Sequence, residues 1–236
     1  FGQGGKENFF SLVKGLETIH GIDRFRISSI EPNLLSNDII EFCLNESEKF
    51  VPHFHIPLQS GNDELLKSMR RKYDTALYRE RIEYIKSLRP DACIGVDVIV
   101  GFPGESDAHF NETVEFLKDL DISYLHVFTY SERANTTAKK MDQVVPIPKR
   151  KERSKVLHLL SDRKKRNFYE SNKGTKRKVL FEDHDHDGYL HGFTENYIKI
   201  KTPYQPSLTN TFCEVNLDYL DRDGIYKSET KSTIEI

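Results

Sequence analysis

A sharp turn directly follows an apolar stretch near the middle of this 236-residue chain. The stretch, residues 94–100, contains a single carboxylate, Asp97, and is otherwise typical of a buried strand. Gly101-Phe102-Pro103-Gly104-Glu105 then forces a turn, and a helical pattern begins near Asp107. Parallel α/β proteins place ligand chemistry at turns of this kind. Because burying Asp97 is costly unless it faces a polar cavity, we expect a sheet with a wet inner side.

Strand-like and helix-like segments alternate through the first 145 residues, which predicts a parallel sheet, open or rolled into a barrel. The expected strands are 24–30, 53–58, 94–101 and 124–130, and the expected helices are 8–20, 36–48, 65–69, 74–88 and 107–120. A helix over 149–172 follows. Short alternating strands after residue 176, with Asp-Gly turns at 187–188 and 223–224, then predict a small antiparallel β-barrel.

Each expected strand of the first part has one aliphatic face and one polar face. The polar faces carry Arg26, His55 with Gln59, Asp97 and His126. Because helices must cover the aliphatic faces, we expect the polar faces to converge on a cavity for a sizeable ligand. The alternative is that the same side chains form one satisfied buried network.

The cysteines and the overall composition narrow the class of protein. Cys43, Cys93 and Cys213 lie far apart without C-x2-C spacing, which fits a reducing compartment and excludes an all-cysteine metal or iron–sulfur site within this chain. No apolar run is long enough to span a bilayer, and no secretory leader is present. We therefore expect a soluble, cytoplasmic protein that does not act at a membrane.

Charge is unevenly distributed along the chain. Residues 149–178 hold 13 lysines and arginines against three acidic residues, although the whole chain has a net charge of −2. A local basic block in an acidic protein favours a polyanionic partner, and the alternative is a solvated helix. The run Asp183-His184-Asp185-His186-Asp187 could suggest a metal site, but beside an Asp-Gly turn we expect a solvated hairpin and no metal.

Several segments together resemble the radical S-adenosylmethionine methylthiotransferases, in that family's order. His55-Ile56-Pro57-Leu58-Gln59-Ser60-Gly61 resembles its H-x-P-x-Q-S-G strand, and Met69-Arg70-Arg71-Lys72-Tyr73 resembles the M-x-R-x-Y that follows. Residues 97–105 resemble its fifth strand, and Tyr130-Ser131-Glu132-Arg133 resembles its sixth. The terminal strands resemble the TRAM module, a small RNA-binding barrel. The resemblance implies an α/β fold with three parts: a partial radical-SAM (β/α) barrel of parallel strands over 1–148, a basic linker helix over 149–174 and a TRAM-like β-barrel over 175–236.

One segment is similar to a particular branch of that family. Ser28-Ser29-Ile30-Glu31-Pro32 matches the S-S-x-E-P of the enzymes that methylthiolate N6-threonylcarbamoyladenosine in tRNA at C2, beside the anticodon. The branches that act on isopentenyladenosine in tRNA or on a ribosomal protein differ at this strand, and both stay as alternatives. A non-catalytic RNA-binding module is a further alternative. The sulfur donor, the particular tRNA and the oligomeric state are left open.

The chain departs from the family pattern at two places. The C-x3-C-x2-C loop, which holds the family's [4Fe–4S] cluster, is absent, so the chain resembles the C-terminal portion of such an enzyme and is expected to be inactive alone. Asn135 stands where the family often has glycine, but asparagine tolerates a left-handed backbone and the turn is expected to survive.

The resemblance also implies roles for particular residues. Gln59 and Ser60 would bind the ribose or methionyl group of S-adenosylmethionine, and Ile99 and Val100 would border its adenine. The remaining candidate cofactor contacts are Ser29, Glu31, Phe128 and Tyr130. The candidate substrate contacts are Arg26, His55, Asp97 and Arg133. The candidate tRNA contacts are Lys164, Lys165, Arg166, Lys176, Arg177 and Lys178, with aromatic surface from Tyr197 and Tyr204.

Overall fold

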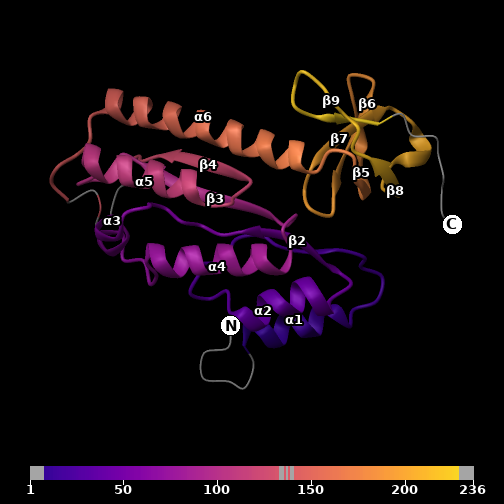
Figure 1. Ribbon diagram of the computed structural model, residues 1–236, viewed down its shortest axis with the longest axis horizontal. Helices are drawn as coiled ribbons and strands as arrows, with labels where there is room; N and C mark the ends of the chain where they lie inside the picture. Colours follow the sequence, from indigo (N-terminus) through magenta and orange to yellow (C-terminus); the bar gives the residue numbers. More distant parts are fainter. Residues whose placement is uncertain (1–7, 133–135, 137, 139–140, 229–236) are drawn as a thin grey trace. The chain divides into compact units, whose positions relative to one another are not determined.

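The computed structural model describes residues 8–132, 136, 138 and 141–228, without the side chains of residues 184–186. The chain divides into two compact units, residues 1–164 and 165–236 (Figure 1). The long helix α6 (Ile147–Ser171) contains the boundary between them. Within the described residues, no helix combines the length and the apolar character that a membrane crossing requires.

The first unit is built on a parallel four-stranded sheet. Its strands β1 (Phe25–Ile27), β2 (Phe50–His55), β3 (Cys93–Val100) and β4 (Tyr124–Thr129) lie in that order. Helix α1 (Phe9–Glu17) precedes β1, and the connections carry α2 (Asn37–Glu41), the π-helical turn η1 (Phe42–Glu46), α3 (Asp63–Ser68), α4 (Thr75–Leu88) and α5 (Asp107–Asp119). The predicted α/β class with parallel strands is therefore confirmed.

Three helices of this unit, α3, α4 and α5, begin at a side chain that caps them, and α3 begins two residues before its expected start. Asn62, Asp74 and Ser106 each accept a hydrogen bond from the backbone N–H three residues later, which satisfies a donor that the first helical turn leaves free. The first expected strand is shorter than predicted. It ends at Ile27, and the backbone of Ser29, at φ 124°, has left the extended conformation that a strand requires.

The aliphatic faces of the strands form the core of the first unit, as the alternation predicts. Phe54, Ile56, Leu58, Val96, Val98 and Val100 are each at most 1% exposed and belong to one cluster with helical residues such as Tyr78, Ile82 and Leu157. Burying a side chain of this kind contributes about 1.5–3 kcal/mol. The helices thus cover one side of the sheet, and the polar side chains are left on the other.

The second unit contains a six-stranded mixed sheet. Its strands are β5 (Lys176–His186), β6 (Tyr189–Thr194), β7 (Lys199–Pro203), β8 (Phe212–Asn216), β9 (Tyr219–Leu220) and β10 (Tyr226–Lys227), in the order β8-β5-β6-β7-β10-β9. A short 3₁₀ helix, η3 (Pro206–Leu208), follows β7. The positive φ angles of Asp187 and Gly188 confirm the predicted tight turn between β5 and β6.

Two details of this second sheet differ from the expectation of a wholly antiparallel barrel. Strand β10 pairs in parallel with β7, because the long connection between them lets the chain return in the same direction. Between residues 212 and 220 the chain forms two strands, because Leu217 still pairs with the backbone of Thr175 beside β5, whereas β9 pairs with β10.

A candidate ligand site at the carboxyl ends of the parallel strands

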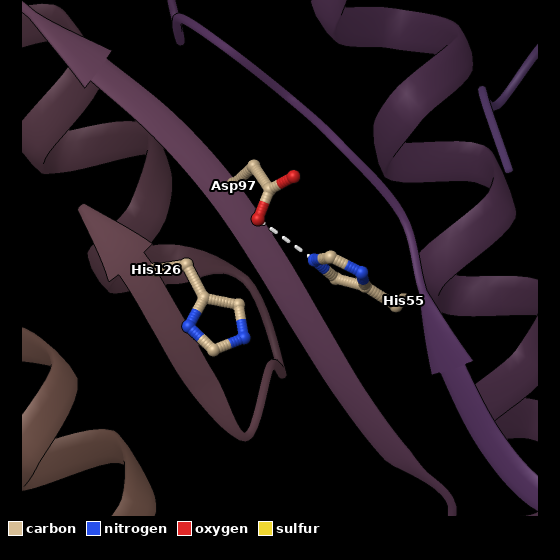
Figure 2. A group of neighbouring side chains, drawn as sticks. All are labelled: His55, Asp97 and His126. Atoms are coloured by element: carbon tan, nitrogen blue, oxygen red, sulfur yellow. Dashed lines mark hydrogen bonds and ion pairs between the residues drawn. The ribbon is translucent and has the colours of Figure 1, made fainter. Parts of the chain in front are cut away.

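Three polar side chains meet on the uncovered face of the parallel sheet. His55, Asp97 and His126 come from β2, β3 and β4, and Asp97 is the register partner of His126 (Figure 2). The Nε2 of His55 lies 2.7 Å from the Oδ1 of Asp97, and the His126 ring stands edge-on to that of His55 at 5.3 Å. One potential ligand atom from each residue lies within 4.8 Å of the others. The group can hold a polar ligand or exchange a proton, and its donor set also suits a divalent metal ion.

The two interpretations of this face each hold for part of it. Near the amino ends of the strands, His53 is 2% exposed and contacts the hydroxyl of Tyr124 at 3.0 Å. Burial lowers the pKa of His53 to about 3, so its ring is neutral and structural. Towards the carboxyl ends, His126 and Arg26 are exposed, and Phe128 is 52% exposed. The described strands therefore carry a closed contact between His53 and Tyr124 and an open polar face towards their carboxyl ends.

Backbone strain marks the carboxyl ends of the strands. Ser29 after β1, Gln59 after β2 and Arg70 after α3 have φ angles of 124°, 73° and 58°. Such conformations cost about 1–3 kcal/mol each in residues other than glycine, and they cluster at functional sites. The Gln59 backbone is held firmly, because its N–H donates to the carbonyl of Asp97 at 2.8 Å and its own carbonyl accepts from Ile99 at 2.9 Å.

Two further residues position the segment after β2. The hydroxyl of Tyr73 donates to the carbonyls of Pro57 and Leu58 at 3.0 and 3.1 Å, and burial raises the pKa of Tyr73 to about 12. Ser60 is 1% exposed, and its hydroxyl lies 3.3 Å from that of Thr113 on α5. The side chain of Ser60 is thus part of the packing beneath the strand ends.

The candidate residues of β3 and β4 fall on different faces. Ile99 lies partly exposed on the polar face, whereas the side chain of Val100 is fully buried against the helices, so only its backbone faces the strand end. The N–H of Tyr130 donates to the carbonyl of Val100 at 2.9 Å, and the Tyr130 ring stands edge-on to Phe102 at 5.7 Å. Arg133 lies outside the described residues.

An ion pair links two segments of the first unit at the carboxyl ends of the strands. Arg71 Nη1 lies 2.8 Å from Glu31 Oε1, linking the segment after β1 to the segment after α3. Arg70 and Arg71 also line a pocket of about 200 Å³, together with Ser68, Met69, Ile99, Phe102, Ala138 and Met141. The predicted cofactor contacts Glu31 and Ile99 are thereby brought to one end of the sheet.

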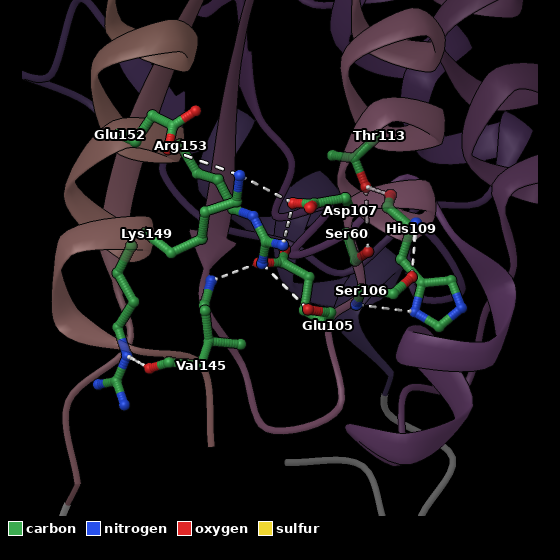
Figure 3. A network of polar contacts seen from close by, with 12 residues as sticks. Ser60, Glu105, Ser106, Asp107, His109, Thr113, Val145, Lys149, Glu152 and Arg153 are labelled. Atoms are coloured by element: carbon green, nitrogen blue, oxygen red, sulfur yellow. Dashed lines mark hydrogen bonds and ion pairs between the residues drawn. The ribbon is translucent and has the colours of Figure 1, made fainter. Parts of the chain in front are cut away.

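A buried charge network fixes the turn after β3 (Figure 3). Glu105 and Arg153 are 5% and 3% exposed and lie 2.6 Å apart, and the same carboxylate accepts from the N–H of Gly101 at 2.6 Å. Arg153 also bonds to Asp107 at 2.8 Å. Desolvation raises the pKa of Glu105, and the N–H of Gly101 and the charge of Arg153 oppose that rise. The turn is therefore anchored to α6.

Sequence reasoning missed this anchoring role of the basic helix. Arg150 is 3% exposed and donates to the carbonyls of Val145 and Tyr130 at 2.7 and 2.8 Å. The signal was available, since Arg153 shares a helical face with the buried Leu157 and Leu160 at spacings of four and seven residues. An arginine on the apolar stripe of a helix indicates a buried partner more than a phosphate contact.

Comparisons with known proteins show which proteins this chain is similar to. A model of the radical SAM superfamily matches residues 5–117. The threonylcarbamoyladenosine tRNA methylthiotransferase MtaB of Aquifex aeolicus is 41% identical over 194 residues, which are 82% of this chain and 46% of that protein. The chain is a relative of the radical SAM methylthiotransferases. The predicted resemblance is therefore confirmed.

Two further relatives have names that give different substrates. MtaB of Bacillus subtilis is 37% identical over 82% of this chain and 44% of its own length. The tRNA-2-methylthio-N(6)-dimethylallyladenosine synthase of Pelotomaculum thermopropionicum is 33% identical over 91% of this chain and 48% of its own length. The chain spans about half the length of the curated relatives it matches.

The cysteines of this methylthiotransferase relative do not fit an iron–sulfur cluster. Cys43, Cys93 and Cys213 are all buried, and burial raises the pKa of Cys43 and of Cys93 to about 12. Cluster ligands are thiolates gathered around one point. Burial keeps the thiols of Cys43 and Cys93 protonated, and among the described residues the three cysteines form no group that could hold a metal ion. The cluster that radical SAM chemistry uses therefore has no ligand set among these three residues.

The candidate RNA-binding residues are divided between structural and exposed positions. Lys164 donates to the carbonyls of Lys118 and Leu120 at the end of α5, and desolvation lowers its pKa. In the second unit, Arg177 is largely buried and bonds to Asn172 and Glu195. These two residues stabilise the fold of their own units.

The other four candidates are exposed. Lys165 lies over the Tyr169 ring at 5.4 Å and Arg166 pairs with Glu170 at 2.8 Å, both on α6. On β5, Lys176 pairs with Glu214 and Lys178 lies over the Phe212 ring at 5.0 Å. Exposed ion pairs contribute little, so these cations can exchange their partners for phosphates at small cost. Among the aromatic candidates, Tyr197 stacks on Phe193 at 4.7 Å, whereas Tyr204 is 38% exposed.

Proposed function

We propose that the full-length protein containing this chain is an enzyme that adds a methylthio group to C2 of N6-threonylcarbamoyladenosine in tRNA. The observation that carries the proposal is the 41% identity, over 82% of this chain, to a relative named for that substrate. The identity to the dimethylallyladenosine synthase cited above is lower, at 33%. The S-S-x-E-P segment after β1 supports the same assignment, because its Glu31 lies at the mouth of the sheet and pairs with Arg71.

S-adenosylmethionine is the proposed cofactor, and the polar face of the sheet suits it. The molecule has a flat purine and a charged methionyl end, and this face combines apolar Ile99 and Phe128 with polar His55 and Asp97. Gln59, with Ser29, Glu31, Ile99, Phe128 and Tyr130, would hold it, together with the backbone at the buried Ser60 and Val100. When bound, S-adenosylmethionine supplies the radical initiator and the methyl group. The residues of this chain would orient the substrate adenosine against it.

The substrate contacts are proposed on the same face. Arg26, His55 and Asp97 would meet the adenosine, with Asp97 fixing the proton position on the His55 ring. tRNA would bind through the exposed cations of the second unit, which follow the phosphate backbone without reading its sequence. The ligands of the [4Fe–4S] cluster are proposed to lie outside this chain, and the isolated chain is therefore proposed to be inactive.

The deciding experiment is nucleoside mass spectrometry of tRNA from a strain that lacks the full-length gene. Loss of 2-methylthio-N6-threonylcarbamoyladenosine alone, restored by the gene on a plasmid, is the expected result. Loss of the isopentenyl analogue would keep the methylthiotransferase activity and overturn the substrate. Unchanged tRNA in a strain without a second such gene would overturn tRNA modification altogether.

A further inference from the structure

Two arginines line one small pocket at the mouth of the sheet. Arg70 and Arg71 follow α3, and the pocket, of about 200 Å³, also contacts Ile99 and Phe102 at the end of β3. Sites that enclose a whole drug-sized ligand measure about 300–1,000 Å³. The pocket is therefore suited to one substituent of a larger ligand that lies along the strand ends.

The guanidinium of Arg71 keeps donors available for a ligand. One of its terminal nitrogens bonds to Glu31 at 2.8 Å, while its Nε is buried without a hydrogen-bond partner among the described residues. A buried unpaired N–H costs about 1–3 kcal/mol, more when the group is charged, so an acceptor at this position would be favoured. A carboxylate is the acceptor whose two oxygens match the parallel N–H groups of an arginine.

The charge and the backbone of the pocket also favour an anion. Arg70 and Arg71 against Glu31 leave one positive charge, which one carboxylate neutralises. Arg70 has a φ of 58°, a strained conformation that places consecutive arginines at the same rim. The Glu31 carboxylate is partly exposed beside them and can accept from a hydroxyl or an amide N–H.

We propose that this pocket is the subsite for the carboxylate of the threonylcarbamoyl group on N6 of the substrate adenosine. The inference rests on the proposed function and deepens it, because it names what separates this substrate from its competitor. A threonylcarbamoyl group carries one carboxylate, whereas a dimethylallyl group carries none. Arg71 binds the carboxylate, Arg70 adds charge at the rim and Glu31 orients Arg71. A polar site of this kind rejects an apolar substituent because its cation would be left unpaired.

The test uses the full-length protein and two anticodon stem-loops that differ at one group. One carries N6-threonylcarbamoyladenosine, and the other carries the same nucleoside with its carboxylate converted to the neutral amide. Fluorescence anisotropy measures the affinity of the protein for each. Wild type is expected to prefer the acid about tenfold, and Arg71→Gln is expected to abolish that preference by weakening the binding of the acid about tenfold more than that of the amide. Arg70→Gln is expected to reduce it in part.

Lys67→Gln provides the matched control, because Lys67 is an exposed cation of α3 that does not line the pocket. It should lower both affinities equally and keep the preference. Arg71→Lys retains the positive charge and loses the paired N–H donors of the guanidinium, so an intermediate preference for the acid is expected. Thermal unfolding of each variant shows whether it is folded. If Arg71→Gln does not fold, the exposed Arg70→Gln decides.

Two outcomes overturn the subsite. Equal affinity of wild type for acid and amide would show that no carboxylate is recognised. An intact preference in Arg71→Gln, together with weakened S-adenosylmethionine binding, would assign the pocket to the methionyl carboxylate. Failure of the proposed function looks different, because wild type would then form no methylthio product on the acid stem-loop by mass spectrometry.

Discussion

At the scale of single residues, His53 ties the stability of the chain to pH. Its pKa is lowered to about 3 in the folded chain and is about 6.5 when the chain unfolds. Between these values the unfolded state binds a proton that the folded state does not. The contribution of His53 is therefore complete above about pH 6.5 and is lost as the pH falls, by at most about 1.4 kcal/mol per pH unit.

His53→Gln should make the free energy of unfolding less sensitive to acid, because glutamine does not titrate. Urea unfolding of the wild-type chain and the variant at pH 7.5 and pH 5.0 measures this. The loss of stability between the two pH values should be smaller in the variant by about 1–2 kcal/mol. An identical loss in both proteins would mean that the ring is protonated inside the fold.

Gly101 offers a second prediction at this scale. A Cβ there would lie 2.4 Å from Cγ of Arg150, and the φ of 78° disfavours any other residue. Gly101→Ala should destabilise the chain by about 2–4 kcal/mol in thermal or urea unfolding. Gly104→Ala is the control, since it shares a positive φ of 87° but its Cβ meets nothing closer than 3.8 Å. Equal losses of unfolding free energy in the two variants would show that the contact with Arg150 does not contribute to the effect.

At the scale of elements, the pair Glu105–Arg153 attaches α6 to the turn after β3. Glu105→Ala leaves a charged guanidinium buried without its main partner and should cost about 3–5 kcal/mol in urea unfolding. The double variant Glu105→Ala, Arg153→Met should recover much of that loss, because no buried charge is then unpaired. Additive losses in the two single variants and the double variant would contradict the coupling.

Most helices and strands could be predicted from the sequence because their signals are local. Asp74 caps α4, and period-two alternation separates the faces of β3. The contacts that could not be predicted join residues far apart in the sequence. The ion pair Glu31–Arg71 joins residues 40 positions apart, and the pairing of β10 with β7 depends on how the sheet closes. Arg153 was assigned with the other basic residues because composition alone does not separate a buried cation from an exposed one.

At the scale of the whole molecule, tRNA binding should depend on the exposed cations and not on the structural ones. Replacing Lys165 and Arg166 by glutamine in the full-length protein should weaken tRNA binding and lower the slope of log affinity against log salt by up to about two. Lys164→Gln should lower the melting temperature of the chain and leave the salt slope unchanged, because Lys164 bonds to helix-end carbonyls. Filter binding at several salt concentrations measures both. Equal salt slopes in wild type and the double variant would show that Lys165 and Arg166 do not contact tRNA.

The three buried cysteines can report local unfolding of the chain. Cys43 and Cys93 lie in the first unit and Cys213 lies in the second, and all three are buried. A maleimide added to the folded chain has no ready target, so each modification records a moment at which that part of the core was exposed. Digestion and peptide mass spectrometry would give one labelling rate for each cysteine. The three rates would show which unit opens first, without any engineered label site.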